Sequence, residues 1–365
     1  MSPLLLHEFH AGLGARFVDV NGCEMVSDYG DSPLEHAALL CSVGVLDLSC
    51  RSRVCLTGGD RVKFLHGQVT NDVQKLRAGE GCYAALITAK GRMQSDLFIY
   101  SLANEILLDF EPGLARPVME RLEKYIIADD VQLVDVEPHY ALLSAQGPKA
   151  KAAVEQLDLG VSLPEMPLQF VSSQVPDIGE IYVVNQPRIG STGFDLFIPN
   201  PSLAAVADRL IAAARQLGGQ ACGWTALEMA RIEAGIPRFG QDMDETNLPP
   251  EAGIESRAVS YTKGCYIGQE VIARIRTYGQ VAKALRGLIL ADNLPSLPSK
   301  GDRLFHGEKE AGIVTSAAAS PTLKKNVALG YVRREVNKPG TELALKTKDG
   351  VSVARIVPLP FGPGL

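Results

Sequence analysis

The spacing of apolar residues changes along the chain, and the change divides it into two regions. Up to about residue 280, helical and strand patterns alternate. Residues 114–127 carry apolar side chains at helical spacing, and residues 92–101 read as a strand. Asn21-Gly22 separates two short strand patterns, which indicates a tight hairpin turn. The pattern therefore predicts a mixed α+β region over residues 1–280.

Helical patterns end beyond residue 280. Short strand patterns separated by Pro, Gly and Asn take their place, at residues 284–290, 312–316, 327–332, 342–346 and 351–356. Many short strands at regular spacing are typical of a small barrel or sandwich. We therefore expect a second, all-β domain over residues 281–365.

The composition of the 365 residues is that of a globular protein, with 46% hydrophobic and 21% charged residues. A formal net charge of −6 argues against a nucleic-acid or anionic-membrane partner bound through bulk charge. No run reaches the ~18 apolar residues of a membrane span, and no basic residue precedes the short apolar run near the N-terminus. The seven cysteines are odd in number and show no C-x-x-C spacing. We therefore expect a soluble, cytoplasmic protein with reduced thiols and no bound metal.

The segment Y-T-K-G-C-Y-I-G-Q-E at residues 261–270 is the first candidate for chemistry. Gly264 and Gly268 free the backbone on both sides of Cys265, as in a tight turn that presents a side chain. Lys263 and the arginines that follow would favour the reactive thiolate form of Cys265. The alternative is a small cysteine buried between two turn glycines, since no histidine base is evident.

Two further stretches place polar residues beside irregular backbone. Arg231 and Glu233 end an amphipathic helix and precede an acidic loop, which is either functional or a solvated connector. Arg188 and Asp195 flank the turn I-G-S-T-G, whose amide and hydroxyl groups could bind a polar ligand. An ordinary hairpin turn is the alternative there.

Asp96 lies inside a predicted strand among apolar residues. A lone carboxylate is unfavourable in such surroundings unless it is paired or hydrogen-bonded. Asp96 is therefore the best candidate for a general acid or base, or for a group that orients a ligand. The alternative is a structural ion pair with Lys90 or Arg92 across the turn.

Together, and in this order along nearly the whole chain, these stretches resemble the glycine-cleavage T-protein (aminomethyltransferase, GcvT-like) superfamily. The resemblance is carried by F-L-H-G-Q-V-T-N-D-V at 64–73, R-I-G-S-T-G-F-D at 188–195, A-R-I-E-A-G-I-P-R-F-G at 230–240 and A-G-I-V-T-S-A-A-A-S-P-T-L at 311–323. The segment K-G-C-Y-I-G-Q-E at 263–270 is similar to the signature of the YgfZ-type branch, whose members bind folate and support iron–sulfur cluster assembly or repair.

The resemblance implies an α+β, three-lobed folate-binding fold, with tetrahydrofolate in a central channel and a C-terminal β-barrel. Asp96 falls in the stretch that holds the family's catalytic aspartate, and Tyr83 and Arg231 match positions that line the folate channel. The implied catalytic residues are Asp96, Lys263 and Cys265. The implied cofactor-binding residues are Tyr83, Asp96, Arg188, Asp195, Arg231 and Glu233.

The chain departs from the aminomethyltransferase pattern at three places. Ser95 stands where the family has the first of two adjacent acids, and Leu227 replaces an arginine. The turn G-S-T-G-F-D at 190–195 lacks the tyrosine and the acid of the usual G-Y-T-G-E-D-G-F-E. A carboxylate there would hold the pterin edge by two hydrogen bonds, so Asp195 or Glu233 would have to substitute for it.

Two functions follow from the resemblance. The leading hypothesis is a tetrahydrofolate-binding YgfZ-type protein that supports iron–sulfur cluster assembly or repair, with iron–sulfur proteins or assembly factors as partners. The alternative is a folate-dependent aminomethyltransferase, the T-protein of glycine cleavage, or a related one-carbon transferase or demethylase, with a lipoyl carrier protein as partner. A third reading is a scaffold of the same fold that has lost its ligand and binds only a protein.

Overall fold

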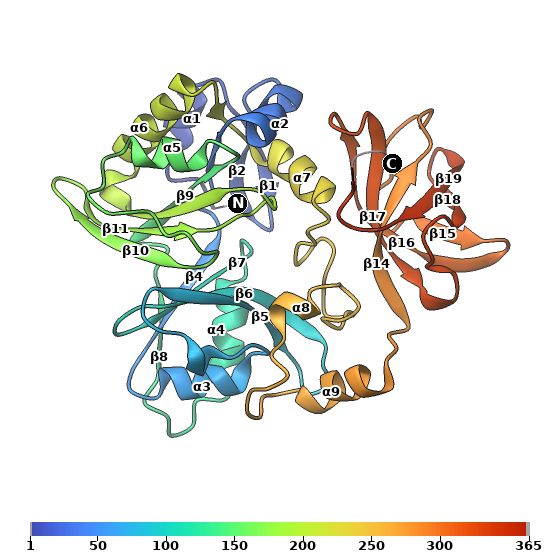
Figure 1. Ribbon diagram of the computed structural model, residues 1–365, viewed down its shortest axis with the longest axis horizontal. Coiled ribbons are helices and arrows are strands. Elements are labelled where there is room, and N and C mark those ends of the chain that lie inside the picture. The colour runs from blue at the N-terminus through green and yellow to red at the C-terminus, as the bar shows by residue number, and fades with distance from the viewer. Residues whose placement is uncertain (1, 363–365) are drawn as a thin grey trace. The chain divides into compact units, whose positions relative to one another are not determined.

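A computed structural model describes residues 2–362 and confirms the mixed helix and sheet content (Figure 1). By packing, the chain divides into two compact units, and each contains two separate stretches of sequence. The first unit comprises Met1–Ala84 and Leu97–Ala230, and the second comprises Ala85–Asp96 and Arg231–Leu365. This division differs from the sequence-based boundary at residue 280, which stays a prediction of domain organisation.

A six-stranded sheet forms one half of the first unit, in the order β10-β11-β12-β9-β3-β13. Its strands are β3 (Gly44–Asp47), β9 (Tyr140–Gln146), β10 (Phe170–Val175), β11 (Gly179–Asn185), β12 (Gly193–Pro199) and β13 (Gln220–Ala221). Helices α5 (Ala150–Glu155) and α6 (Leu203–Gln216) cover one side of this sheet (Figure 1). Because α6 is rich in alanine, it packs closely on the strands, with Leu210 and Ala214 fully buried.

A five-stranded sheet forms the other half, in the order β5-β6-β7-β4-β8. Its strands are β4 (Ser52–Thr57), β5 (Glu80–Ile87), β6 (Met93–Ser101), β7 (Ile106–Phe110) and β8 (Gln132–Asp135). Helices α3 (Arg61–Gln68) and α4 (Ala115–Glu123) belong to the same half, and α4 is shorter than the predicted helix over 114–127. Residues Ala85–Asp96, at the tip of the β5–β6 hairpin, belong to the second unit.

The two sheets of the first unit share a hydrophobic core. Tyr100 of β6 contributes from the five-stranded sheet, and Leu142 of β9 and Phe197 of β12 contribute from the six-stranded sheet. This region holds both the buried charges and the aromatic cavity described below.

The N-terminal part of the first unit adds α1 (His7–Gly12), α2 (Ser32–Cys41) and the hairpin of β1 (Arg16–Val20) and β2 (Cys23–Asp28). The hairpin turns at Asn21 and Gly22, whose φ angles are 53° and 82°. A two-residue turn of this kind needs positive φ at both positions, so the predicted hairpin is confirmed.

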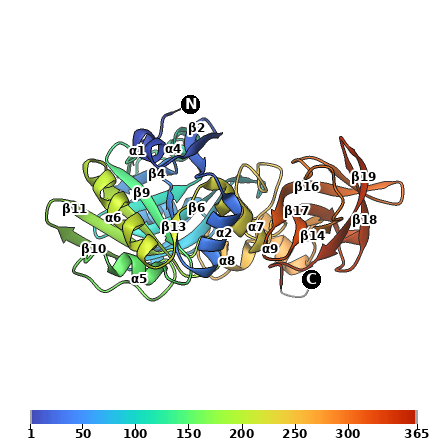
Figure 2. The same ribbon diagram turned by 90° about the horizontal axis from the view of Figure 1, so that it is seen from above.

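The second unit contains a closed six-stranded barrel in the order β14-β17-β16-β15-β18-β19, seen from a second side in Figure 2. The strands are β14 (Lys283–Leu290), β15 (Arg303–His306), β16 (Lys309–Ser320), β17 (Lys325–Arg333), β18 (Glu342–Thr347) and β19 (Gly350–Val357). Alternate residues such as Val314, Leu345 and Ile356 fill the interior. The predicted C-terminal barrel is confirmed.

Helix α7 (Trp224–Glu233) runs into the second unit, which also holds α8 (Glu255–Ala258) and α9 (Gln269–Tyr278). Over residues 2–362, the structure has no helix that is long and apolar enough to cross a membrane.

The barrel core offers a direct test of the packing. Leu345→Ala should lower the free energy of unfolding by about 2–5 kcal/mol, because it removes a fully buried side chain and leaves a cavity. Val351→Ala, at a position that is 68% exposed, is the matched control and should change it by less than about 0.5 kcal/mol. Urea unfolding followed by circular dichroism measures both, and equal effects of the two variants would contradict the assigned barrel interior.

Candidate functional site

Strand β6 carries the leading catalytic candidate. Side chains alternate along a strand, so Asp96, Phe98 and Tyr100 share one face and Ser95, Leu97 and Ile99 share the other. The second face is fully buried, whereas Asp96 and Phe98 are half-buried. An acid at position 95 would lie in the core, where an unpaired carboxylate is strongly unfavourable. The acid that this chain retains is therefore the one on the more accessible face.

The alternative for Asp96 is an ion pair with Arg92, but Arg92 also contacts two other groups. The Arg92 guanidinium donates to the carbonyl oxygen of Thr246 and lies 3.7 Å from the Glu251 carboxylate. All of these residues belong to the second unit. Arg92 therefore binds the loop that precedes α8.

An aromatic pair follows Asp96 on the same face of β6. The ring of Tyr83 on β5 lies 5.0 Å from the ring of Phe98 at an angle of 39°. The guanidinium carbon of Arg188 lies 5.7 Å from the centre of the Phe98 ring. Two rings and a cation thus lie together in the first unit, with Tyr83 and Arg188 buried and Phe98 half-buried.

Arg188 is held in place by a buried carboxylate. Its Nε and Nη2 atoms donate to both oxygens of Asp195, at distances of 2.6–3.1 Å. Ser144 Oγ donates to the same carboxylate at 2.7 Å, and Asp195 is fully buried. The two predicted ligand contacts are therefore direct partners of each other.

Asp109 of β7 extends this pair into a cluster. It accepts a hydrogen bond of 2.9 Å from Arg188 Nη2 and one of 2.8 Å from Arg51 Nε. Arg51 also donates to Glu111 at 2.8 Å. Burial alone would raise the pKa of Asp109, but the two guanidinium groups outweigh it and lower that pKa. We call Arg51, Asp109, Glu111, Arg188 and Asp195 the charge cluster.

Sequence reasoning missed Arg51, Asp109 and Glu111. The available signal was weak: charged residues stand at the edges of short apolar runs, where they are usually exposed. Only the pairing of β4 with β7, together with the turn before β12, brings the opposite charges together.

Arg231 and Glu233 lie in the last turn of α7 and bind the barrel. Arg231 donates to Asp242 at 2.5 Å and to Ser316 at 2.7 Å, and Ser320 donates to Glu233 at 2.5 Å. Asp242 is 3% exposed, so the start of the acidic loop is a structural element of the second unit rather than a solvated connector. Direct contact of Arg231 or Glu233 with folate stays a prediction.

The segment around Cys265 forms a tight turn before α9, as predicted. Gly268 has a φ of 83°, and a Cβ there would lie 2.4 Å from the Thr88 carbonyl oxygen, so only glycine fits. Cys265 is exposed. Lys263 is buried, with its ammonium 4.9 Å from the centre of the Tyr266 ring. A catalytic part for Lys263 and Cys265 stays a prediction.

The structure therefore brings the predicted residues together in separate groups. Tyr83, Arg188 and Asp195 gather in the first unit, and Arg231 and Glu233 meet the barrel in the second. Among residues 2–362, no group of three or more His, Cys, Asp or Glu side chains is arranged to hold a metal ion.

This fold and its barrel define a class of protein. The chain belongs to the family described as the GCVT N-terminal domain, which matches residues 6–263. The glycine cleavage T-protein C-terminal barrel domain matches residues 283–362. Both matches confirm the predicted superfamily and its α+β folate-binding fold with a C-terminal barrel.

Relatives with established names match along their full length. An aminomethyltransferase of Geobacillus thermodenitrificans is 31% identical over 98% of this chain and 97% of its own length. One of Shouchella clausii is 29% identical over 98% and 96%. The crystal structure of the glycine cleavage system aminomethyltransferase T from Bartonella henselae has a TM-score of 0.89 and 26% identity, and the match covers 99% of this chain and 98% of that one.

These comparisons correct the leading hypothesis from the sequence. The full-length relatives are aminomethyltransferases, so an iron–sulfur maintenance function is wrong as the main reading and the alternative is better supported. The error came from giving one eight-residue segment, K-G-C-Y-I-G-Q-E, more weight than a likeness spread over both domains. A short turn motif reports local backbone geometry, which unrelated functions can share.

The charge cluster makes a measurable prediction. Asp109→Asn should destabilise the protein by about 1.5–3 kcal/mol at pH 7, because Arg51 and Arg188 lose their shared carboxylate and keep only Glu111 and Asp195 as partners. Since the pKa of Asp109 is lowered in the folded state, its contribution is complete above the ordinary value of about 3.9. The contribution disappears as the pH falls through the lowered folded-state pKa.

The measurement is the urea midpoint of wild type and variant at pH 7 and again near pH 2 to 3, where the gap should narrow. Asp208→Asn, at an exposed position on α6, is the control and should match wild type throughout. A wild type and D109N that unfold together at pH 7 would show that the cluster does not stabilise the fold.

Proposed function

We propose that this protein is a tetrahydrofolate-dependent aminomethyltransferase, either of the glycine-cleavage type or acting on a related N-methyl donor. The observation that carries the proposal is the end-to-end match, which spans 98% of this chain and 97% of an aminomethyltransferase. Because both domains match, the likeness covers the arrangement of the whole fold rather than a single motif.

Tetrahydrofolate is the cofactor, since the homologous aminomethyltransferases depend on it. The fit can be judged on the first unit, where the Tyr83–Phe98 pair offers an apolar aromatic surface and Arg188 adds a cation. Such a surface suits a flat heterocycle with a negatively charged tail. When bound, tetrahydrofolate would supply the amine that accepts the one-carbon unit.

Asp96 is the residue we assign to the chemistry. Its half-buried carboxylate can accept a proton from a reacting amine or donate one to it, which is the role of a general base or acid. Its neighbour Ser95 is fully buried on the opposite face and keeps its hydroxyl on the backbone carbonyl of Asp96 at 3.0 Å. The strand therefore presents one carboxylate where the family pattern has two adjacent acids.

Arg188 would contribute its positive charge beside the Phe98 ring. Asp195 would act through Arg188 as a positioning residue, because its carboxylate already accepts hydrogen bonds from Arg188 and Ser144. Within the second unit, Arg231 and Glu233 bind the barrel, and their contact with folate is proposed from the resemblance alone. We expect a lipoyl carrier protein to deliver the aminomethyl group, and we place the reaction in the cytoplasm.

The proposal is tested by incubating purified protein with tetrahydrofolate and an aminomethyl-lipoyl carrier protein, and measuring methylene-tetrahydrofolate. We expect turnover by wild type and a rate about 10²- to 10⁴-fold lower in Asp96→Asn, since that variant cannot exchange the proton. Calorimetric titration with tetrahydrofolate should show that D96N still binds. Asp208→Asn, far from the assigned residues in sequence and exposed, should keep the wild-type rate.

Two outcomes would count against the assignment. If wild type makes no product from the lipoyl carrier, N-methylated donors such as sarcosine replace it, and methyl-tetrahydrofolate is measured instead, because an N-methyl carbon transferred without an oxidant stays a methyl group. Failure of these donors too would remove the transferase function. If D96N retains full activity, Asp96 is not the acid or base.

A further inference from the structure

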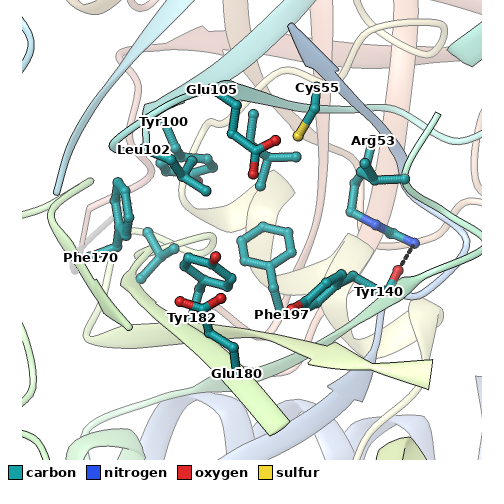
Figure 3. Close-up of a pocket in the computed structure, with 13 residues that line it drawn as sticks. Arg53, Cys55, Tyr100, Leu102, Glu105, Tyr140, Phe170, Glu180, Tyr182 and Phe197 are labelled. Atoms are coloured by element: carbon teal, nitrogen blue, oxygen red, sulfur yellow. Dashed lines mark hydrogen bonds between the residues drawn. The ribbon is translucent and has the colours of Figure 1, made fainter. Parts of the chain in front are cut away.

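A cavity of about 230 Å³ lies within the first unit, between its two sheets (Figure 3). Strands β4, β6 and β7 of one sheet and β9 to β12 of the other contribute its walls. None of its described lining residues is among those predicted to bind folate. The cavity is therefore separate, in its residues, from the assigned transferase site.

Five aromatic rings surround the cavity: Tyr100, Tyr140, Phe170, Tyr182 and Phe197. Tyr100 meets Phe170 and Phe197 edge-on, with ring centres 6.0 and 6.1 Å apart and planes at 81° and 66°. Tyr140 meets Tyr182 in the same way, at 6.0 Å and 65°. In an edge-to-face pair the edge of one ring covers only one face of the other, so other π faces remain to contact a guest.

Two carboxylates, Glu105 and Glu180, stand among these rings, and Figure 3 shows Glu180 beside Tyr182. Both are half-buried. They also line an outer pocket of about 410 Å³, which shares Leu102, Phe170 and Tyr182 with the cavity. The shared residues place the outer pocket at the mouth, and its described charged lining residues are these two acids. A guest entering by this route meets negative charge first.

The negative charge at the cavity also acts on the pKa of Tyr182. Burial raises it, and the neighbouring Glu180 carboxylate raises it further, because both disfavour a phenolate. Tyr182 therefore stays neutral across the physiological pH range and presents a hydroxyl and a π face rather than a charge.

Arg53 is the cation among the described lining residues, and the two carboxylates outnumber its single positive charge. Its Nη atoms donate to the carbonyl oxygens of Arg51, Ser49 and Tyr140 at 2.7–3.0 Å, and Figure 3 shows the bond to Tyr140. Its Nε is buried without a hydrogen-bond partner. A buried donor left without a partner is unfavourable, and a guest with a hydroxyl or ether oxygen would satisfy it.

We propose that this cavity binds a small organic ammonium ion, with its N-alkyl groups against the aromatic faces and its charge toward Glu105 and Glu180. Aromatic cages recognise methylated ammonium groups because the ring faces carry negative charge density and the alkylated cation is weakly hydrated. A cavity of about 230 Å³ is large enough for a cation of this size. The proposal does not rest on the transferase function.

The test compares two molecules of nearly the same shape and different charge. Choline carries a trimethylammonium group and a hydroxyl, and 3,3-dimethyl-1-butanol replaces its nitrogen by carbon. Calorimetry on the full chain should show choline binding at least about tenfold more tightly than the neutral alcohol. Equal affinity for the two would mean that the cavity is merely apolar. No choline binding up to about 50 mM, a concentration on the order of a hundredfold above the Kd of an ordinary ligand, would mean that there is no site. Either result overturns the proposal.

Variants then locate the site. Glu105→Gln with Glu180→Gln should weaken choline binding by about tenfold and leave the neutral alcohol unchanged. Glu123→Gln with Glu155→Gln makes the same change in net charge at exposed positions and should leave both affinities at the wild-type values. Tyr182→Leu keeps an apolar wall and loses a π face, so it should weaken choline selectively.

Thermal midpoints of all variants within a few degrees of wild type show that the fold is retained. Selectivity for choline that survives in the lining double variant, or is lost equally in the exposed one, would place binding elsewhere and overturn the assignment.

Discussion

The first unit depends on one buried carboxylate shared by two arginines. Asp109 lies on the five-stranded sheet, Arg188 stands beside the six-stranded sheet, and Arg51 precedes β4. Each arginine also binds a second carboxylate, Arg51 that of Glu111 and Arg188 that of Asp195. Removing either arginine would leave one of these acids buried without its cation, and that is far less favourable than an exposed pair losing a partner. The cluster therefore ties the two sheets of this unit together beside their shared hydrophobic core.

Two consequences for function follow from that fixed junction. Arg188 is held over the ring of Phe98, next to Tyr83, on the face of β6 that carries Asp96. Farther along the same face of β6, Tyr100 lines the aromatic cavity. Strand β6 thus carries the assigned catalytic residue near its beginning and lines a chemically different cavity near its end.

The segment around Cys265 shows that a short motif can predict local geometry and still mislead about function. Its glycine pattern predicted a tight turn, and Gly268 adopts the backbone that only glycine allows beside Thr88. That success concerned geometry, whereas the function read from the same residues was wrong. The likeness that corrected it is distributed over both domains, residues 6–263 and the barrel over 283–362.

The sequence by itself determined the features that depend on near neighbours. Short strand patterns and turn residues predicted five of the six barrel strands, all but β15, together with the Asn21-Gly22 hairpin and the strand that holds Asp96, because each is set within a few residues. Only the tertiary structure decided which charges pair and which rings enclose space. Asp109 finds Arg51 58 residues away and Arg188 79 residues away. Such partners are chosen by how sheets pack, and no local pattern encodes that.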